Sequence, residues 1–169
     1  MTIKTILVPT DFSGPSTAAL AYAKALAHAL GASIHLLHVT QDPTAQPWAE
    51  EAYPAALVEI LEELKAQARG QLVAELSPSE RKKYRSVVTV AVGVPFTRII
   101  EYARNNEIDL IVMGTHGRGA IAHMILGSVT ERVVRFAPCA VLSVPAKGKG
   151  EKKTGRKKAV GRRRRSSET

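Results

Sequence analysis

Short apolar runs alternate along the chain with segments in which apolar residues recur every three or four positions. The first run, residues 3–8, is rich in β-branched residues and stops at Pro9, as a strand would. Residues 16–30 have alanine and leucine at helical spacing, and Gly31 follows where a left-handed cap would end a helix. Continued along the chain, the pattern predicts strands at 3–8, 33–39, 86–92, 109–113 and 140–144, and helices at 16–30, 57–72, 96–105 and 128–136.

Two of the expected helices are clearly amphipathic. In the longest one the apolar stripe keeps a 3.6-residue period and comprises Leu57, Ile60, Leu61, Leu64, Ala68 and Leu72. In the last one, Val129, Val133 and Val134 are expected to face the core. Residues 41–54, with three prolines, and the polar residues 77–85 are expected to be connections.

This alternation of strands and helices predicts βα units and a parallel sheet. The strands are apolar nearly throughout, which is typical of strands that helices cover on both faces. The sequence therefore predicts an α/β fold: a three-layer arrangement with an open five-stranded parallel sheet between helices.

The net charge of +9 is confined to the C-terminal end. Residues 1–146 hold 13 Lys+Arg and 13 Asp+Glu, whereas residues 147–169 hold 11 and 2. The latter segment has no Leu, Ile, Phe, Tyr or Trp, so it cannot bury enough apolar surface to offset its ordering entropy. We expect a folded domain at 1–146 and a disordered basic tail at 147–169.

Cysteine usage and hydropathy indicate the compartment. The single cysteine, Cys139, excludes an intrachain disulfide and fits a reducing compartment. The N-terminal apolar run is too short for a signal peptide, and the longest uncharged stretch, residues 25–41, contains three histidines and is not a membrane span. We expect a cytoplasmic protein without a transmembrane segment, in which Cys139 is buried as a small apolar residue.

A glycine-rich segment, GTHGRGAIAHMILGSVT, joins the fourth expected strand to the last expected helix. Glycines let the backbone approach a ligand closely, and the first amides of a helix have no internal partner, so such a segment is a common anion site. The alternative is that the glycines only make tight turns. The segment lacks the GxxxxGK[ST] pattern of a Walker loop, and the first strand is not followed by GxGxxG.

The spacing Gly114-x2-Gly117-x9-Gly127-Ser128 resembles the G-2x-G-9x-G-[S/T] signature of the universal stress protein family. Four further segments resemble segments of that family and occur in the same order: ILVPTDFS at 6–13, LLHV at 36–39, GVP at 93–95 and CAVLSVP at 139–145. The resemblance covers residues 1 to about 146. It implies the adenine nucleotide alpha-hydrolase-like fold with strand order 3-2-1-4-5, and a homodimer formed through the last strand.

The resemblance also implies an adenine-nucleotide site, because family members with this signature commonly bind ATP. AMP and cyclic AMP would share much of the pocket, and Mg²⁺ would arrive with the phosphates. Phosphate contacts are implied for Gly117, Gly127, Ser128, Val129 and Thr130, and a ribose contact for Gly114. Adenosine would meet Pro9, Thr10, Asp11 and the main chain of Val39, and the pocket would be flanked by Met113, His116 and Arg118.

Three functions remain open at this point. The first is a nucleotide-dependent regulator in a stress response. The second is a slow ATPase or phosphotransferase, although no Gln or Glu stands beside the glycine segment before Glu131 to activate water. The third is binding of nucleic acid or an anionic surface by the tail. Each site also has a purely structural alternative: Asp11 only stabilises the turn after strand one, His116 and Arg118 are exposed loop residues, and the tail is only solvated. His28, His35, His38 and His123 share no metal-ligand spacing, and we expect them to be ordinary helix and strand residues.

Overall fold

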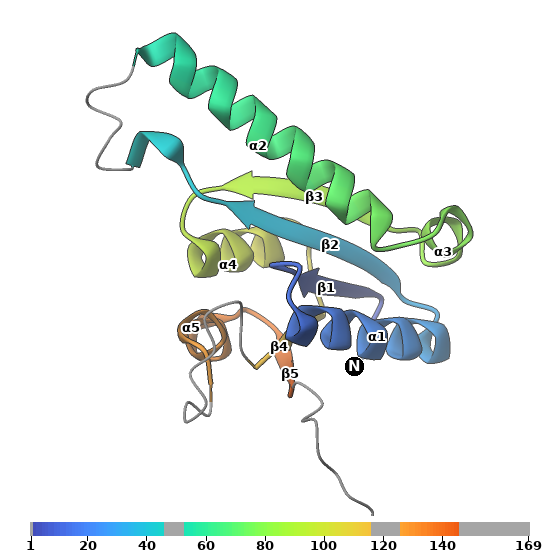
Figure 1. Ribbon diagram of the computed structural model, residues 1–169. Coiled ribbons are helices and arrows are strands. Elements are labelled where there is room, and N and C mark those ends of the chain that lie inside the picture. Colours follow the sequence, from blue (N-terminus) through green and yellow to red (C-terminus); the bar gives the residue numbers. More distant parts are fainter. Residues whose placement is uncertain (1, 46–52, 116–125, 146–169) are drawn as a thin grey trace, which may run out of the picture.

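Five parallel strands form one sheet in the order β3-β2-β1-β4-β5 (Figure 1). The structure is a computed structural model and describes residues 2–45, 53–115 and 126–145. The predicted α/β class and strand order are both confirmed. The strands are β1 (Thr5–Pro9), β2 (Ser33–Thr40), β3 (Val87–Val92), β4 (Leu110–Gly114) and β5 (Ala140–Val144).

Helices cover the sheet on both faces, and each face has its own core layer. Helices α1 (Gly14–Leu30) and α2 (Pro54–Ala74) pack on one face, with Leu20, Ala23 and Leu72 among the buried residues. Helices α4 (Pro95–Asn105) and α5 (Ser128–Phe136) pack on the other, where Ile99, Ala103 and Val133 are buried. A 3-10 turn, η1 (Pro43–Ala45), and a short helix, α3 (Pro78–Lys83), complete the described elements. Gly31 ends α1 in the predicted left-handed conformation, with φ of 67°.

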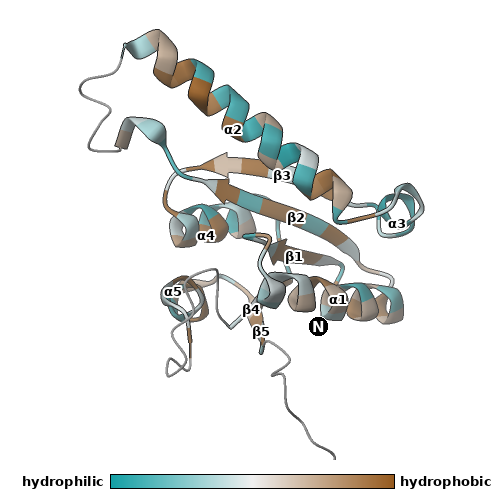
Figure 2. Cartoon of the chain, in the orientation of Figure 1, coloured by the Kyte–Doolittle hydropathy of each residue, from teal (hydrophilic) through white to brown (hydrophobic). Residues whose placement is uncertain are grey.

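Burial is complete in the centre of the sheet and partial at its edges. Ile6, Leu7 and Val8 of β1 are wholly buried, and Figure 2 shows the strands as largely apolar. In the expected apolar stripe of α2, Ala68 and Leu72 are buried and Leu57, Leu61 and Leu64 are half-buried, whereas Ile60 is 36% exposed. Figure 1 shows the reason: the amino-terminal part of α2 reaches beyond the sheet.

The inward placement of Val134 is wrong. In α5, Val133 is completely buried whereas Val134 is 51% exposed. Consecutive residues of a helix lie about 100° apart, and this nine-residue helix turns only a narrow stripe toward the sheet.

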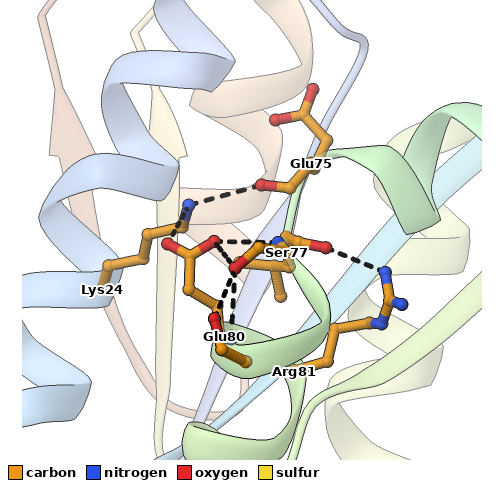
Figure 3. Close-up of polar contacts among 7 residues, drawn as sticks. Lys24, Glu75, Ser77, Glu80 and Arg81 are labelled. Carbon is orange, nitrogen blue, oxygen red and sulfur yellow. Dashed lines mark hydrogen bonds and ion pairs between the residues drawn. The ribbon is translucent and has the colours of Figure 1, made fainter.

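The polar connection expected at 77–85 instead contains helix α3. Ser77 and Glu80 form a capping box, in which the Ser77 hydroxyl accepts from the Glu80 amide and the Glu80 carboxylate accepts from the Ser77 amide at 2.8 Å. Lys24 of α1 reaches the same carboxylate at 2.9 Å (Figure 3), and Arg81 donates to the last carbonyls of the α2 region. The Lys24 ammonium, followed by the Ser77 donors, lowers the pKa of Glu80 to about 2. The network therefore ties α3 to α1 and to the end of α2.

Candidate functional site

The chain leaves the carboxyl ends of two adjacent strands toward opposite faces of the sheet. After β1 it enters α1, which packs in one core layer, and after β4 it leads to α5, which packs in the other. Ligands of open parallel sheets bind at such a point, because the two connections diverge there. We call this place the β1–β4 switch point. The predicted residues Pro9 to Asp11 follow one strand, and Gly114 and Gly127 to Thr130 follow the other.

The turn between β1 and α1 is held by short-range hydrogen bonds. The Thr10 hydroxyl accepts from the Phe12 amide at 3.0 Å and donates to the Ser16 hydroxyl at 3.1 Å. Asp11 accepts from the amide and hydroxyl of Ser13, and Ser13 is the residue that caps α1. Phe12 takes a left-handed conformation, with φ of 63°. Asp11 thus stabilises the turn after β1, as the purely structural alternative expects, and its contact with adenosine stays a prediction.

Gly114 has a packing reason to be glycine. A Cβ at this position would lie 2.9 Å from the carbonyl carbon and the Cβ of Pro15, at the start of α1. The end of β4 therefore touches the backbone of α1, which only a residue without a side chain permits. The implied contact of Gly114 with ribose stays a prediction beside this structural role.

In and just before the first turn of α5, some polar groups form hydrogen bonds within the fold and others are available at the switch point. The Gly127 amide donates to Thr115 at 2.7 Å, and the Thr130 hydroxyl, which is buried, donates to the Gly114 carbonyl at 2.9 Å. The Ser128 side chain is exposed, and Val129 packs partly into the core. No side chain caps the helix among the described residues, so the amides of residues 128–130 remain as donors for an anion.

Val39 lies at the end of β2, next to the β1–α1 turn. The Thr10 amide donates to the Leu37 carbonyl at 2.9 Å on the β1 side of β2. Because peptide groups point to the same side of a strand at every second residue, the amide and carbonyl of Val39 also face that side, where β1 has ended. This orientation suits the predicted main-chain contact of Val39.

His38 makes a contact that the sequence did not reveal. Its Nδ1 lies 2.8 Å from the Thr10 carbonyl oxygen, and its ring stacks on Phe12 with the centroids 4.6 Å apart. No spacing in the sequence signals this interaction, because it depends on the path of the β1–α1 turn. His38 does lie in strand β2, as expected, and makes this contact in addition. His35, on the same strand, packs within the α4 layer and bonds to Tyr102 at 3.0 Å.

Of the four other predicted residues, Met113 is buried in the core and three lie outside the described part of the chain. Met113 is 5% exposed and belongs to the core layer beneath α4 and α5, so its side chain fills the interior. His116, Gly117 and Arg118 lie outside the described residues. Their roles stay predictions, as does the basic tail at 147–169, which the structure does not describe either.

Other titratable groups lie apart from the switch point. Burial lowers the pKa of His35. Cys139 is half-buried against the α4/α5 layer rather than fully buried as expected. This burial and, to a smaller extent, the nearby Asp109 carboxylate raise the pKa of its thiol, and a hydrogen bond with the Ile111 backbone opposes them. Within the described ranges, no three His, Cys, Asp or Glu side chains gather as a metal site, and no helix is long and apolar enough to cross a membrane.

Known proteins resemble this chain over nearly all of its described length. The model of the Universal stress protein family matches residues 2–145. A universal stress protein of Thermus aquaticus is 37% identical over 144 residues, covering 83% of this chain and 98% of the relative. The structure of Methanocaldococcus jannaschii MJ0577 is 29% identical with a TM-score of 0.73 and covers 88% of this chain and 99% of that one. A universal stress protein in complex with cAMP is 25% identical with a TM-score of 0.59, covering 86% and 99%.

Proposed function

The chain belongs to the universal stress protein family, and from this membership we propose that it binds an adenine nucleotide at the β1–β4 switch point. The observation that carries the proposal is the divergence of α1 and α5 from adjacent strands beside an uncapped helix start. The related universal stress protein in complex with cAMP supports an adenine nucleotide as the ligand class. Occupancy of the site would make the protein a nucleotide-dependent regulator in a stress response.

The nucleobase would lie on the side of β1 and β2. The main chain of Val39 faces the space beyond the end of β1 and offers one donor and one acceptor, which match the Watson–Crick edge of adenine. Pro9, Thr10 and Asp11 line the same end of β1, where Asp11 is positioned by Ser13 to approach the ribose.

The phosphates would lie on the side of β4 and α5. The amides of Ser128, Val129 and Thr130 lie at the positive end of the α5 dipole, and Ser128 is exposed there. Gly127 precedes them without a side chain to obstruct the approach. His116, Gly117 and Arg118 would close this side, with the Arg118 guanidinium as a bidentate partner for phosphate oxygens.

ATP is the proposed nucleotide, with Mg²⁺ carried by its phosphates and turnover slow at most. Glu131, the acidic residue in the first turn of α5, is exposed and lies within ion-pair distance of Arg135 at 3.8 Å. A homodimer through β5 is proposed as well, because β5 is an edge strand whose Leu142 is 37% exposed.

Calorimetric titration with ATP–Mg, AMP and cyclic AMP tests the site. We expect saturable binding by the wild-type protein and its loss in Gly127→Val. The backbone of Gly127, with φ of −71° and ψ of 151°, is one that valine adopts without strain, so this variant is expected to block the phosphates, and circular dichroism checks that its fold is kept. Gly70→Val is the matched control, because Gly70 is exposed on α2 and has open space around it. Wild-type protein that has been freed of bound nucleotide and binds none of the three would refute the proposal.

We propose a second function for the basic tail, because all of the net charge lies in residues 147–169. Its lysines and arginines would bind nucleic acid or another polyanion by counterion release, without sequence preference and with strong salt dependence. The test is retention on heparin with and without residues 147–169. Equal elution salt for the two proteins would refute it.

A further inference from the structure

We infer that His38 is a positioning residue that keeps the β1–β2 ladder open at its carboxyl end and so leaves the main chain of Val39 to the nucleobase. The inference rests on the proposed nucleotide site and adds to it a residue outside the glycine signature. It is carried by the hydrogen bond from His38 to Thr10 and by the register of the two strands.

The register shows which bond is missing from the ladder. β1 and β2 pair from Thr5 with Ser33 to Pro9 with Leu37, and the Thr10 amide adds a last bond to the Leu37 carbonyl. In a parallel ladder the next bond would run from the Val39 amide to the Thr10 carbonyl. Among the backbone hydrogen bonds of the described residues this bond does not occur.

His38 supplies the donor that the ladder lacks. A carbonyl oxygen only accepts, so the His38 Nδ1 that lies 2.8 Å from the Thr10 oxygen carries the hydrogen. The Thr10 carbonyl is thereby satisfied by a side chain. The Val39 amide and carbonyl are left facing the space beyond β1, where they can pair with the edge of a base.

Phe12 holds the His38 ring in this orientation. The two rings are stacked with an interplanar angle of 29°, and Phe12 occupies a left-handed conformation that a residue with a side chain rarely adopts. The bond from the Phe12 amide to the Thr10 hydroxyl stabilises that conformation. Thr10, Phe12 and His38 therefore form one unit that links the turn after β1 to the end of β2.

Two substitutions distinguish the effect of the His38 hydrogen-bond donor from that of its imidazole ring. His38→Leu removes the donor, whereas His38→Asn places an amide N–H near the position of Nδ1. We expect His38→Leu to weaken AMP binding about tenfold, the value of roughly one hydrogen bond, and His38→Asn to restore it. His35→Leu is the control, because His35 lies on the same strand and bonds to Tyr102 of α4 on the opposite face.

A second ligand shows whether the effect reaches the base. Purine riboside 5′-monophosphate lacks the exocyclic amino group of AMP but keeps its ribose and phosphate. The wild-type protein should prefer AMP, and His38→Leu should lose this preference because the main-chain contacts of Val39 are no longer held in place. A general loss of folding would weaken both ligands equally, and so would contradict the inference.

NMR of the nucleotide-free protein tests the ladder directly. We expect ¹⁵N spectra to show the proton on His38 Nδ1, and the Val39 amide to exchange faster than that of Leu37. A proton on Nε2 alone, or equal protection of the two amides, would overturn the open ladder. Wild-type protein that binds neither nucleotide would overturn the proposed function and with it the purpose assigned to His38. Equal AMP affinity and preference in wild type and His38→Leu would overturn the role of His38 alone.

Discussion

Replacing Gly114 by alanine should destabilise the fold even when no nucleotide is present. The added Cβ would meet the carbonyl carbon and Cβ of Pro15 at 2.9 Å and its oxygen at 3.0 Å, well inside the roughly 3.5–4.0 Å at which carbon atoms pack best. These are mostly backbone atoms at the start of α1, which lies across β1 and β4. They cannot rotate away, so relief requires α1 to shift on the sheet.

Overpacking of this kind costs about 1–3 kcal/mol. For a domain of this size that corresponds to a fall in the melting temperature of roughly 2–4 °C per kcal/mol, or about 6 °C for a cost near 2 kcal/mol. Urea unfolding followed by far-ultraviolet circular dichroism measures the change in the free energy of unfolding. The midpoint should fall while the slope with denaturant stays the same, because the surface exposed on unfolding does not change.

Gly70→Ala is the matched control for this experiment. Gly70 lies within α2, and apart from its chain neighbours and the helix's own backbone nothing lies within 4 Å of the place that an alanine methyl group would take there. Alanine in a helix interior should stabilise by about 0.5–1 kcal/mol relative to glycine. If Gly114→Ala has the same midpoint as the wild type, the contact with Pro15 does not constrain position 114, and the glycine would be explained by the ligand alone.

Three further predictions concern titration. The pKa of Glu80 is about 2 in the folded protein against an ordinary value of 4.5, so its contribution to stability is complete above pH 4.5 and is lost as the pH falls toward 2. Glu80→Gln should therefore make the free energy of unfolding less dependent on pH between 4.5 and 2. The same acid dependence in the variant and the wild type would contradict this. Burial lowers the pKa of His35 below 6.5, so on acidification the unfolded chain binds a proton at this residue before the folded chain does, and stability falls as the pH drops below 6.5. His35→Asn should remove that part of the pH dependence when unfolding by urea is measured at several pH values. A pH dependence equal to that of the wild type would refute the prediction. Because the pKa of Cys139 is raised, iodoacetamide at pH 8 should alkylate the native thiol more slowly than the same thiol in urea, and equal rates by mass spectrometry would contradict the burial.

The central elements were predictable because their signals are strong and local. β1 and β4 are apolar runs bounded by Pro9 and Gly114, and the structure buries every residue from Ile6 to Val8 completely. The cap at Gly31 followed from its position after an alanine-rich helix. The strand order came from the family resemblance, since the pattern of apolar residues does not say which strands are neighbours.

Helix α3 escaped the sequence analysis because its six residues carry no apolar periodicity. Its signal was the capping pattern of Ser77, Pro78 and Glu80, which is independent of hydrophobicity. Val134, and Ile60 in the apolar stripe of α2, are more exposed than their spacing predicts for another reason. Helical spacing identifies an apolar stripe, but it does not say how much of that stripe the sheet is long and wide enough to cover.

The location of the candidate site was also predictable from local signals, whereas several of its contacts were not. The glycines and the Ser-Val-Thr after them mark the place, but the structure shows that the Gly127 amide and the Thr130 hydroxyl already bond within the fold. The contact of His38 with Thr10 arises from two segments that the sheet brings together. No spacing within the sequence encodes such a contact.

The position of β1 between β2 and β4 has a consequence for synthesis on the ribosome. β1 meets β2 early, but its other edge waits for residues as distant as Leu110 and Ile111, which pair with Ile6 and Leu7. A nascent chain that has not yet reached β4 therefore presents an apolar, unpaired edge, the feature that invites intermolecular strand pairing. The central strand of the finished sheet is thus the one at greatest risk of aggregation while the chain is being made.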